Sequence, residues 1–218
     1  MGEKKGKYKI VAPKIPKNLE EYISLDPNIQ DEDLISMKVI CDCEIENEMA
    51  EHVEFKQIIF RNVNFKEVSF KFIELTDIRF ENCDLSNVDF YGAIIHRVEL
   101  INCKIVGINL SESSLQNVKF ENCNGRYSFF SFSKLKQVDF NNSLLQSTNF
   151  QNSNFAKVRF EECNLQQAQM SGTKLKGIDF SSCEIEGLGI RIEDLSGVEV
   201  SPMQAVSLSK LMGLIIKI

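Results

Sequence analysis

The dominant pattern in this chain is a large apolar residue at every fifth position from Phe55 to Val200, interrupted only at Gly125. A second set of residues, nearly all small or β-branched, stands two positions before each member of the first set. A period of five fits neither an α-helix, whose apolar positions are three and four apart, nor a simple strand, whose apolar positions alternate. It predicts a chain that turns a corner every five residues and directs two side chains of each unit inward, so that successive units stack.

The repeated units resemble those of a known family. Asn82-Cys-Asp-Leu-Ser-Asn-Val-Asp-Phe90 and Ser153-Asn-Phe-Ala-Lys-Val-Arg-Phe160 are similar to pentapeptide repeats, and the resemblance covers about two thirds of the chain. It implies an all-β solenoid, a right-handed quadrilateral β-helix with four units in each coil. We therefore expect an extended lead-in over residues 1–32, the β-helix over residues 33–200 with irregular first coils that form a cap, and a C-terminal helix and strand over residues 201–218.

Composition adds little to this picture but excludes some classes. The 218 residues are 43% hydrophobic, and no stretch of eighteen apolar residues occurs. The lysines near the N-terminus are not followed by the apolar core of a signal peptide. These features argue against a membrane protein and against secretion, and they lead us to expect a cytoplasmic protein.

Five of the seven cysteines occupy the inward small position of one side of the coil: Cys83, Cys103, Cys123, Cys163 and Cys183. They are separated by multiples of twenty residues, and Ser143 fills the gap. Since twenty residues make one coil, we expect a stacked interior ladder of free thiols that act as small apolar fillers. His52 and His96 lie off this ladder, so no metal site is expected. Cys41 and Cys43 have no place in this scheme, and one Cys-x-Cys is weak evidence for a site.

One side of the coil carries more inward aromatic rings than any of the other three. Its large residues are Phe60, Phe80, Leu100, Phe120, Phe140, Phe160, Phe180 and Val200. Their inward partners two positions earlier are all β-branched, from Ile58 to Val198. Because β-branched side chains suit an extended, pleated backbone, we expect this Phe side to be the straightest of the four.

Acidic residues collect on the outward positions of the Phe side: Glu81, Glu99, Glu121, Asp139, Glu161, Glu162, Asp179 and Glu199. The basic residues among them are Arg61, Arg79, Lys119 and Arg159, while a lysine cluster lies on the preceding side. A narrow rod needs a charged surface in any case. The alternative interpretation is that regularly spaced carboxylates imitate the phosphates of a nucleic-acid duplex and face a DNA-binding groove. No side is basic along its length, so direct nucleic-acid binding is not expected.

Gly125 stands where a large residue is expected, in the segment from Cys123 to Phe130. One interpretation is a local void that a neighbour such as Tyr127 or Phe129 fills. The other is a kink or bulge that displays Arg126 and Tyr127 as a contact segment.

The repeat ends at Ser201-Pro202-Met203-Gln204, which has the form of a helix capping box with proline at the first helical position. We expect a helix to about Met212, a stop at Gly213 and a terminal strand over residues 214–218. The apolar residues here are Met203, Val206, Leu208, Leu211, Met212, Leu214, Ile215 and Ile216. They fit a lid over the last coil, or a dimer interface with an open strand edge, and we favour the dimer interface.

This C-terminal pattern, Ser-Pro-x-Gln-Ala followed by Leu-x-Gly-Leu-Ile-Ile, resembles the Qnr group of quinolone-resistance pentapeptide proteins, and most closely those of Gram-positive bacteria. The resemblance implies a head-to-head homodimer whose acidic rod is shaped like B-form DNA, binds DNA gyrase and topoisomerase IV and protects them from fluoroquinolones. Gram-negative Qnr proteins carry projecting loops, for which the constant phase from residue 55 to residue 200 leaves no room. Any topoisomerase contact is therefore expected on the rod surface or on the segment 123–130.

An enzyme is the weakest hypothesis, because no catalytic triad, phosphate loop or metal-ligand cluster is present and a regular core leaves no substrate pocket. No cofactor or small-molecule substrate is therefore expected. The main alternative to DNA mimicry is a non-catalytic scaffold that binds an unrelated protein partner. The two differ in salt dependence, since a charged mimic loses affinity as salt rises and an apolar contact does not.

Overall fold

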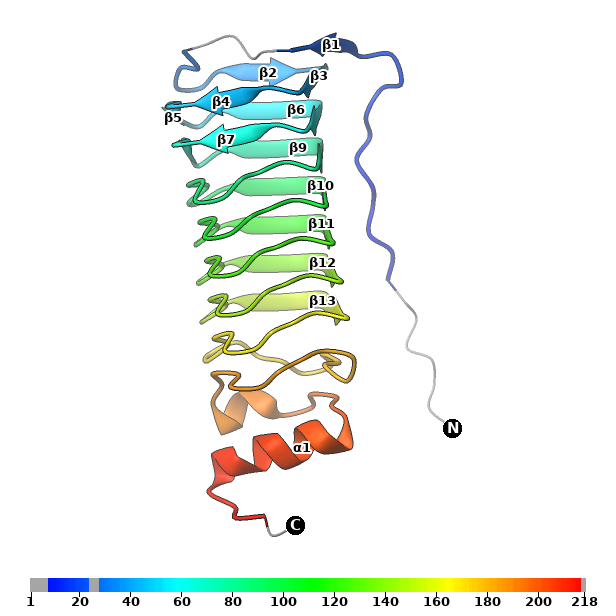
Figure 1. The fold of residues 1–218 in the computed structure, drawn as a ribbon, viewed down its shortest axis with the longest axis vertical. Coiled ribbons are helices and arrows are strands. Elements are labelled where there is room, and N and C mark those ends of the chain that lie inside the picture. Colours follow the sequence, from blue (N-terminus) through cyan, green and yellow to red (C-terminus); the bar gives the residue numbers. More distant parts are fainter. Residues whose placement is uncertain (1–7, 24–27, 217–218) are drawn as a thin grey trace.

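The protein is a column of stacked coils, seen in a computed structural model that describes residues 8–23 and 28–216 (Figure 1). One sheet runs along the column and contains β6 (Glu54–Arg61), β9 (Glu74–Glu81), β10 (Ile94–Ile101), β11 (Ser114–Glu121), β12 (Lys134–Asn141) and β13 (Asn154–Glu161). All of these strands are parallel, and each residue pairs with the one twenty positions further on, as Phe60 does with Phe80. The expected all-β solenoid is confirmed.

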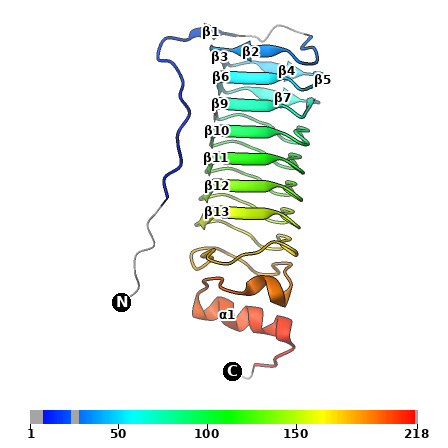
Figure 2. The ribbon, with the colours of Figure 1, turned by 180° about the vertical axis from the view of Figure 1, so that it is seen from behind.

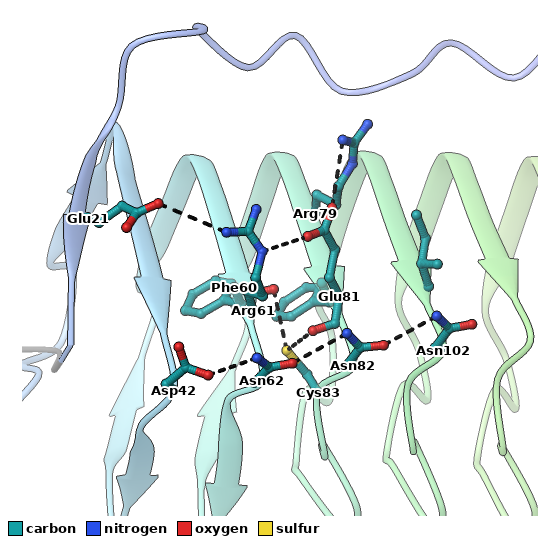
Figure 3. Close-up of polar contacts among 12 residues, drawn as sticks. Glu21, Asp42, Phe60, Arg61, Asn62, Arg79, Glu81, Asn82, Cys83 and Asn102 are labelled. Atoms are coloured by element: carbon teal, nitrogen blue, oxygen red, sulfur yellow. Dashed lines mark hydrogen bonds and ion pairs between the residues drawn. The ribbon is translucent and has the colours of Figure 1, made fainter.

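The corners of the coil explain the five-residue period. From Met37 to Gly177, every fifth residue has a backbone φ in the left-handed region. Non-glycine residues adopt this conformation at a cost of about 1–2 kcal/mol, and asparagine tolerates it better than most. Five corners in register are asparagines whose side-chain amides bond from coil to coil: Asn62, Asn82, Asn102, Asn122 and Asn142. Figure 3 shows the first three of them, with Asp42 accepting from Asn62 at the N-terminal end of the row.

The Phe side is extended as expected, but it is not the only extended side. Each eight-residue strand covers the Phe side and the side before it, with a left-handed corner such as Gln57 between the two halves. The other two sides form short strands only near the N-terminal end. There β4 (Glu44–Glu46) pairs with β7 (Asn64–Lys66), and β5 (Met49–Glu51) pairs with β8 (Ser69–Lys71). Further along, these sides are joined by single bridges.

The N-terminal coil is more regular than expected. β2 (Leu34–Ser36) and β3 (Lys38–Cys41) both pair with β6 in the twenty-residue register. β1 (Glu20–Tyr22) pairs with β3 and lies over the end of the column (Figure 2). Regular pairing follows because Ile35, Ile40 and Ile45 already keep the phase of the repeat. The extended lead-in therefore contains a strand of its own.

Stacked phenylalanine rings form the core of the Phe side. The ring centroids of Phe120 and Phe140 are 4.7 Å apart, and those of Phe140 and Phe160 are 5.0 Å apart, with nearly parallel planes. These distances match the spacing of hydrogen-bonded strands. Leu100 interrupts the column, and an apolar cavity of about 10 Å³ lies around it.

The predicted cysteine ladder is confirmed as a structural feature. All five of its thiols are free and buried, and those of Cys83, Cys103 and Cys123 donate to carbonyl oxygens of the preceding coil. Buried hydroxyls do the same elsewhere, as the Ser133 Oγ does to the Leu110 oxygen at 2.7 Å. Small polar side chains are thus accepted inside because they satisfy backbone carbonyls near the corners.

Cys41 and Cys43, whose positions the repeat pattern did not explain, belong to the N-terminal coil. Cys41 is buried beneath β1, with its thiol 3.8 Å from the Tyr22 carbonyl oxygen, and Cys43 packs half-buried against the core. Burial raises the pKa of the Cys43 thiol, so it is a poor nucleophile at neutral pH. Among the described residues, no three His, Cys, Asp or Glu side chains lie close enough together to hold a metal ion.

Of the two interpretations of Gly125, the bulge is wrong, and neighbours do fill the space but they are not Tyr127 or Phe129. The coil runs through it without a bulge, because Asn124 pairs with its neighbours in register and the Gly125 N–H donates to Leu144. A side chain is missing there because Ile105 and Leu145 from the adjacent coils fill the space. A Cβ on Gly125 would lie 3.0 Å from a Leu145 methyl carbon. Tyr127 and Phe129 instead point outward and are exposed.

The C-terminal helix forms as expected, but the strand does not. After η1 (Ile192–Leu195), α1 (Pro202–Ser209) begins with the predicted capping box, continues into η2 (Lys210–Met212) and stops at Gly213, whose φ is 74°. Residues 214–216 are irregular, and residues 217–218 lie outside the described part. A strand needs a neighbouring edge to accept its backbone hydrogen bonds, and α1 covers the last coil. No helix in the described ranges is long and apolar enough to span a bilayer.

Candidate interaction surface

The residues expected to imitate DNA do lie along one face of the column, which we call the acidic side. Seven of them flank the Phe column, one on each successive coil, and Glu162 occupies the corner beside it. They differ in exposure: Asp139 is buried, Glu81, Glu99 and Glu121 are half-buried, and the remainder are exposed. The acidic side is therefore not uniform along its length.

Ion pairs neutralise the N-terminal half of the acidic side. The Arg61 guanidinium lies 3.0 Å from the Glu81 carboxylate of the next coil (Figure 3). Arg79 pairs in the same way with Glu99, at 2.8 Å. Lys119 pairs with Glu121 at 2.7 Å within one coil. Such half-exposed pairs contribute little stability, about 0–1 kcal/mol each. Their main effect is to reduce the negative charge that this part of the face presents.

Residues 8–18 form a further cover that sequence reasoning missed, and we call this segment the strap. From β1 it runs back along the outside of the column toward the C-terminal end (Figures 1 and 2). The signal for it was present in Pro13 and Pro16, which favour an extended backbone at three-residue spacing. Nothing in the repeat pattern shows that such a segment folds back onto the rod.

The strap ends at Asp139. The Tyr8 hydroxyl donates to Asp139 Oδ1 at 2.8 Å, and Arg159 forms an ion pair with the other carboxylate oxygen and lies over the Tyr8 ring. Burial and the adjacent carboxylate both raise the pKa of the Tyr8 hydroxyl, so it remains a proton donor. Asp139 is thus satisfied within the molecule and is the least available of the predicted acidic residues.

The strap backbone is held by one corner of the coil, which we call the corner ladder: Gln57, Asp77, Arg97, Asn117 and Gln137. The Lys14 N–H donates to Asp77 at 2.8 Å, and the Val11 N–H donates to Asn117 at 3.2 Å. Gln57 donates to the Lys14 carbonyl at 3.1 Å, and Gln137 donates to that of Lys9 at 3.4 Å.

Asp77 is held in place by a second member of the corner ladder. The Arg97 guanidinium donates two hydrogen bonds to the Asp77 carboxylate, of 2.5 and 2.7 Å. Burial alone would raise the pKa of Asp77, but the bonds from Arg97 and from the strap outweigh it and lower that pKa. Burial and the nearby Arg97 in turn lower the pKa of His96, which is therefore neutral at pH 7.

The C-terminal half of the acidic side is more open. Glu161, Glu162, Asp179 and Glu199 are all exposed, although Glu161 also lines an open cavity of about 550 Å³ together with Tyr8, Lys9 and Ile10 of the strap. The lysine cluster of the preceding side is exposed at the same level, in Lys157, Lys174 and Lys176. The two charges therefore lie on adjacent sides of the same coils.

The apolar residues after the repeat differ in exposure. Leu208 packs half-buried against the last coil and acts as a lid. Seven others are exposed: Met203, Val206, Leu211, Met212, Leu214, Ile215 and Ile216. Ile215 is 91% exposed, and an apolar cavity of about 400 Å³ opens between α1 and the last coil beside Met212.

A second exposed group lies around the segment singled out by Gly125. Tyr127, Phe129 and Phe132 are exposed by 59%, 46% and 61% on and beside one side of the coil. Arg126 is less available, because its guanidinium donates to the Gln146 side chain of the next coil at 3.1 Å.

Comparison with known proteins agrees with this architecture. A model of the pentapeptide repeat region matches residues 73–150, and a model of eight pentapeptide repeats matches residues 143–181, so that together they cover half of the chain. The chain belongs to the pentapeptide-repeat family. Proteins with this β-solenoid are generally structural or protein-binding rather than enzymatic.

Individual relatives are more distant. The uncharacterized protein YisX of Bacillus subtilis is 40% identical over 111 residues, which are 51% of this chain and 52% of YisX. HetL of the cyanobacterium Nostoc, involved in heterocyst differentiation regulation, is 15% identical with a TM-score of 0.44, covering 78% of this chain and 87% of HetL. QnrB1, a plasmid-mediated fluoroquinolone resistance protein, is 14% identical with a TM-score of 0.40, covering 81% of this chain and all of QnrB1.

Proposed function

We propose that this pentapeptide-repeat protein binds the DNA-binding groove of type II topoisomerases, DNA gyrase and topoisomerase IV, and protects them from fluoroquinolones. The observation that carries the proposal is the exposed line of carboxylates on the C-terminal half of the acidic side. The C-terminal helix sequence, which resembles that of Qnr proteins of Gram-positive bacteria, supports the choice of partner. Because both enzymes act on bacterial chromosomes, the proposal places the protein in the cytoplasm.

The spacing of these charges suits a groove that binds a duplex. Glu161, Asp179 and Glu199 flank the same column on successive coils, and each coil rises by about 4.8 Å. Phosphates of one DNA strand advance about 3.4 Å along the axis, so the two charge lines are of similar density. A positively charged groove that is shaped for DNA attracts the DNA phosphates and the carboxylates of the acidic side alike.

Dimerisation would double this surface, and we include it in the proposal. The exposed apolar residues of α1, η2 and residues 214–216 lie at the same end as the open carboxylates. Two copies joined through these residues would bring their open acidic halves together at the centre of one longer rod. The partner copy would also supply the edge that residues 214–216 lack for strand pairing.

The test is a gyrase supercoiling assay with ciprofloxacin and increasing amounts of the protein. We expect supercoiling to be restored by the wild-type chain and lost with Glu161→Lys/Asp179→Lys. The matched control is Glu184→Lys/Glu186→Lys, which makes the same change in net charge at the same level on the next side of the coil. Equal loss in both variants would show that net charge matters rather than the acidic side, and no rescue by the wild type would refute protection.

The dimer has its own test. Leu211→Asp/Met212→Asp should give monomers in analytical ultracentrifugation, because two buried charges are costly at an apolar interface. Met203→Gln is a milder control on the same surface. A wild-type chain that sediments as a monomer at high concentration would remove the dimer from the proposal.

A scaffold that binds another protein is the second candidate, and the aromatic group of Tyr127, Phe129 and Phe132 favours it. Exposed aromatic side chains commonly anchor protein interfaces. A partner captured through Phe129 and Phe132 should bind with little salt dependence, whereas gyrase binding through the acidic side should weaken steeply as salt rises. Binding of a partner other than a topoisomerase that is lost in Phe129→Ser/Phe132→Ser but kept in Glu161→Lys/Asp179→Lys would favour this second candidate.

A further inference from the structure

The corner ladder has the geometry of a binding site for an extended peptide. Its rungs are one coil apart, about 4.8 Å. The N–H groups of Lys14 and Val11 are three residues apart and bind Asp77 and Asn117, which are two coils apart. Three residues of polyproline II helix span about 9.3 Å, close to the rise of two coils. Every third peptide N–H of an extended segment can therefore reach every second rung of the ladder.

The ladder recognises backbone more than sequence. Four of its bonds to the strap involve peptide N–H or C=O groups, from Lys9, Val11 and Lys14. One feature of a bound segment still matters. Prolines spaced like Pro13 and Pro16 keep the backbone extended, which holds its peptide groups at the spacing of the ladder.

The strap is bound in a way that allows exchange. Every residue from 8 to 18 is exposed or half-buried, so little apolar surface holds it in place. Its hydrogen bonds could be replaced one for one by another extended backbone. The coils beneath it are closed by their own ladder pairing, as between β9 and β10 or β11 and β12, which does not involve the strap.

We propose that the corner ladder is a peptide-binding groove and that the strap is its resident ligand, displaced when an extended, proline-spaced segment of a partner protein binds. The inference is independent of the topoisomerase proposal. It assigns a second interaction surface, on the N-terminal half of the column, to a different kind of partner.

The test removes the backbone donors of the strap in the full-length chain. Val11→Pro/Lys14→Pro deletes the two N–H groups that bind Asn117 and Asp77 while keeping the backbone extended. Ala12→Pro is the matched control, because the Ala12 N–H makes no bond among the described residues. Tryptic cleavage after Lys9 and Lys17 should be at least tenfold faster in the double variant than in the wild type or in Ala12→Pro.

The second measurement uses a fluorescein-labelled synthetic peptide of residues 8–18 and fluorescence anisotropy. The double variant should bind the peptide at least tenfold more tightly than the wild type, whose groove is already filled. Adding Asn117→Gly, which keeps the left-handed corner but removes the acceptor, should abolish that gain. Unchanged tryptic cleavage, equal peptide binding by the wild type, or no binding by the double variant would each overturn the proposal. No topoisomerase is needed, so the result is separate from the test above.

Discussion

Leu100→Phe should stabilise the protein, because Leu100 is the one gap in an otherwise aromatic column from Phe60 to Phe180. Phe60 and Phe80 are stacked at 4.9 Å on one side of the gap, and Phe120 and Phe140 at 4.7 Å on the other. A ring at position 100 would stack on Phe80 and on Phe120 at the same rise. Each new aromatic pair is worth about 0.5–1.5 kcal/mol beyond the area that it buries.

The opposing term is overpacking, which costs about 1–3 kcal/mol in a filled core. Around Leu100 this cost is reduced by the apolar cavity of about 10 Å³. We therefore expect a net gain of about 1 kcal/mol, equivalent to a rise in Tm of about 2–4 °C for a chain of this size. Because the coils of a solenoid contact only their neighbours, the gain should be local and add to changes elsewhere.

Denaturant unfolding at equilibrium measures the effect, with an unchanged m-value as the sign that the unfolded state is the same. Leu115→Phe is the matched control: Leu115 is fully buried on the adjacent side and does not line the cavity, so the same change should destabilise by about 1–3 kcal/mol. Phe140→Leu removes a ring that stacks on both Phe120 and Phe160, and it should also destabilise the protein. Equal destabilisation by Leu100→Phe and Leu115→Phe would refute the reasoning.

Three further predictions concern the corners, the C-terminal cap and pH. Asn102→Ala should cost about 1–3 kcal/mol in chemical denaturation, because it loses two ladder bonds and forces alanine into a left-handed corner, while Asn102→Gly should cost clearly less. Gln204→Ala should lower Tm and speed hydrogen exchange in α1, because the Gln204 side chain caps the helix and donates to the Phe180 and Cys183 carbonyl oxygens at 2.8 and 2.7 Å. Unchanged exchange would contradict this. The stabilisation from Asp77 is fully present above the ordinary carboxyl pKa of about 3.9 and is lost as the pH falls through its lowered pKa, so the NMR resonance of the Lys14 amide should keep its bound position down to about pH 4 and shift below it. The measurement is made in a His96→Gln background, because the imidazole beside Arg97 also titrates in this region, and loss of the bound position between pH 7 and pH 5 in that variant would contradict the role of Asp77.

The regular part of the fold followed from sequence because each structural requirement repeats. A unit of five residues must supply two inward side chains and a corner, and Phe60, Phe80 and their equivalents show this in every coil. The helix from Pro202 was equally accessible, since a capping box and a stop glycine are local signals. The periodicity did not show why asparagine recurs at the corners, which depends on left-handed φ values and bonds between coils.

The candidate surface could be predicted from the sequence only in part, because contacts between coils decide which of its residues are exposed. Sequence placed Glu81, Glu99 and Asp139 on one side correctly, but exposure depends on groups twenty or more residues away. Arg61 and Arg79 appear in sequence as isolated positive charges, and only the stacking of coils pairs them with specific carboxylates. The filling of the space at Gly125 by Ile105 and Leu145 was hidden for the same reason.

By itself, the sequence determined the five-residue repeat and the C-terminal helix, because these depend on local signals. The family resemblance added the four-sided coil and with it the interior thiol ladder, which depend on contacts at a constant separation of twenty residues. Only the tertiary structure decided where residues 8–18 lie, since Tyr8 and Asp139 are separated by 131 positions and no period relates them. It also decided that the strand over residues 214–218 does not begin at Leu214 in a single chain, because a strand forms only where another backbone offers an edge.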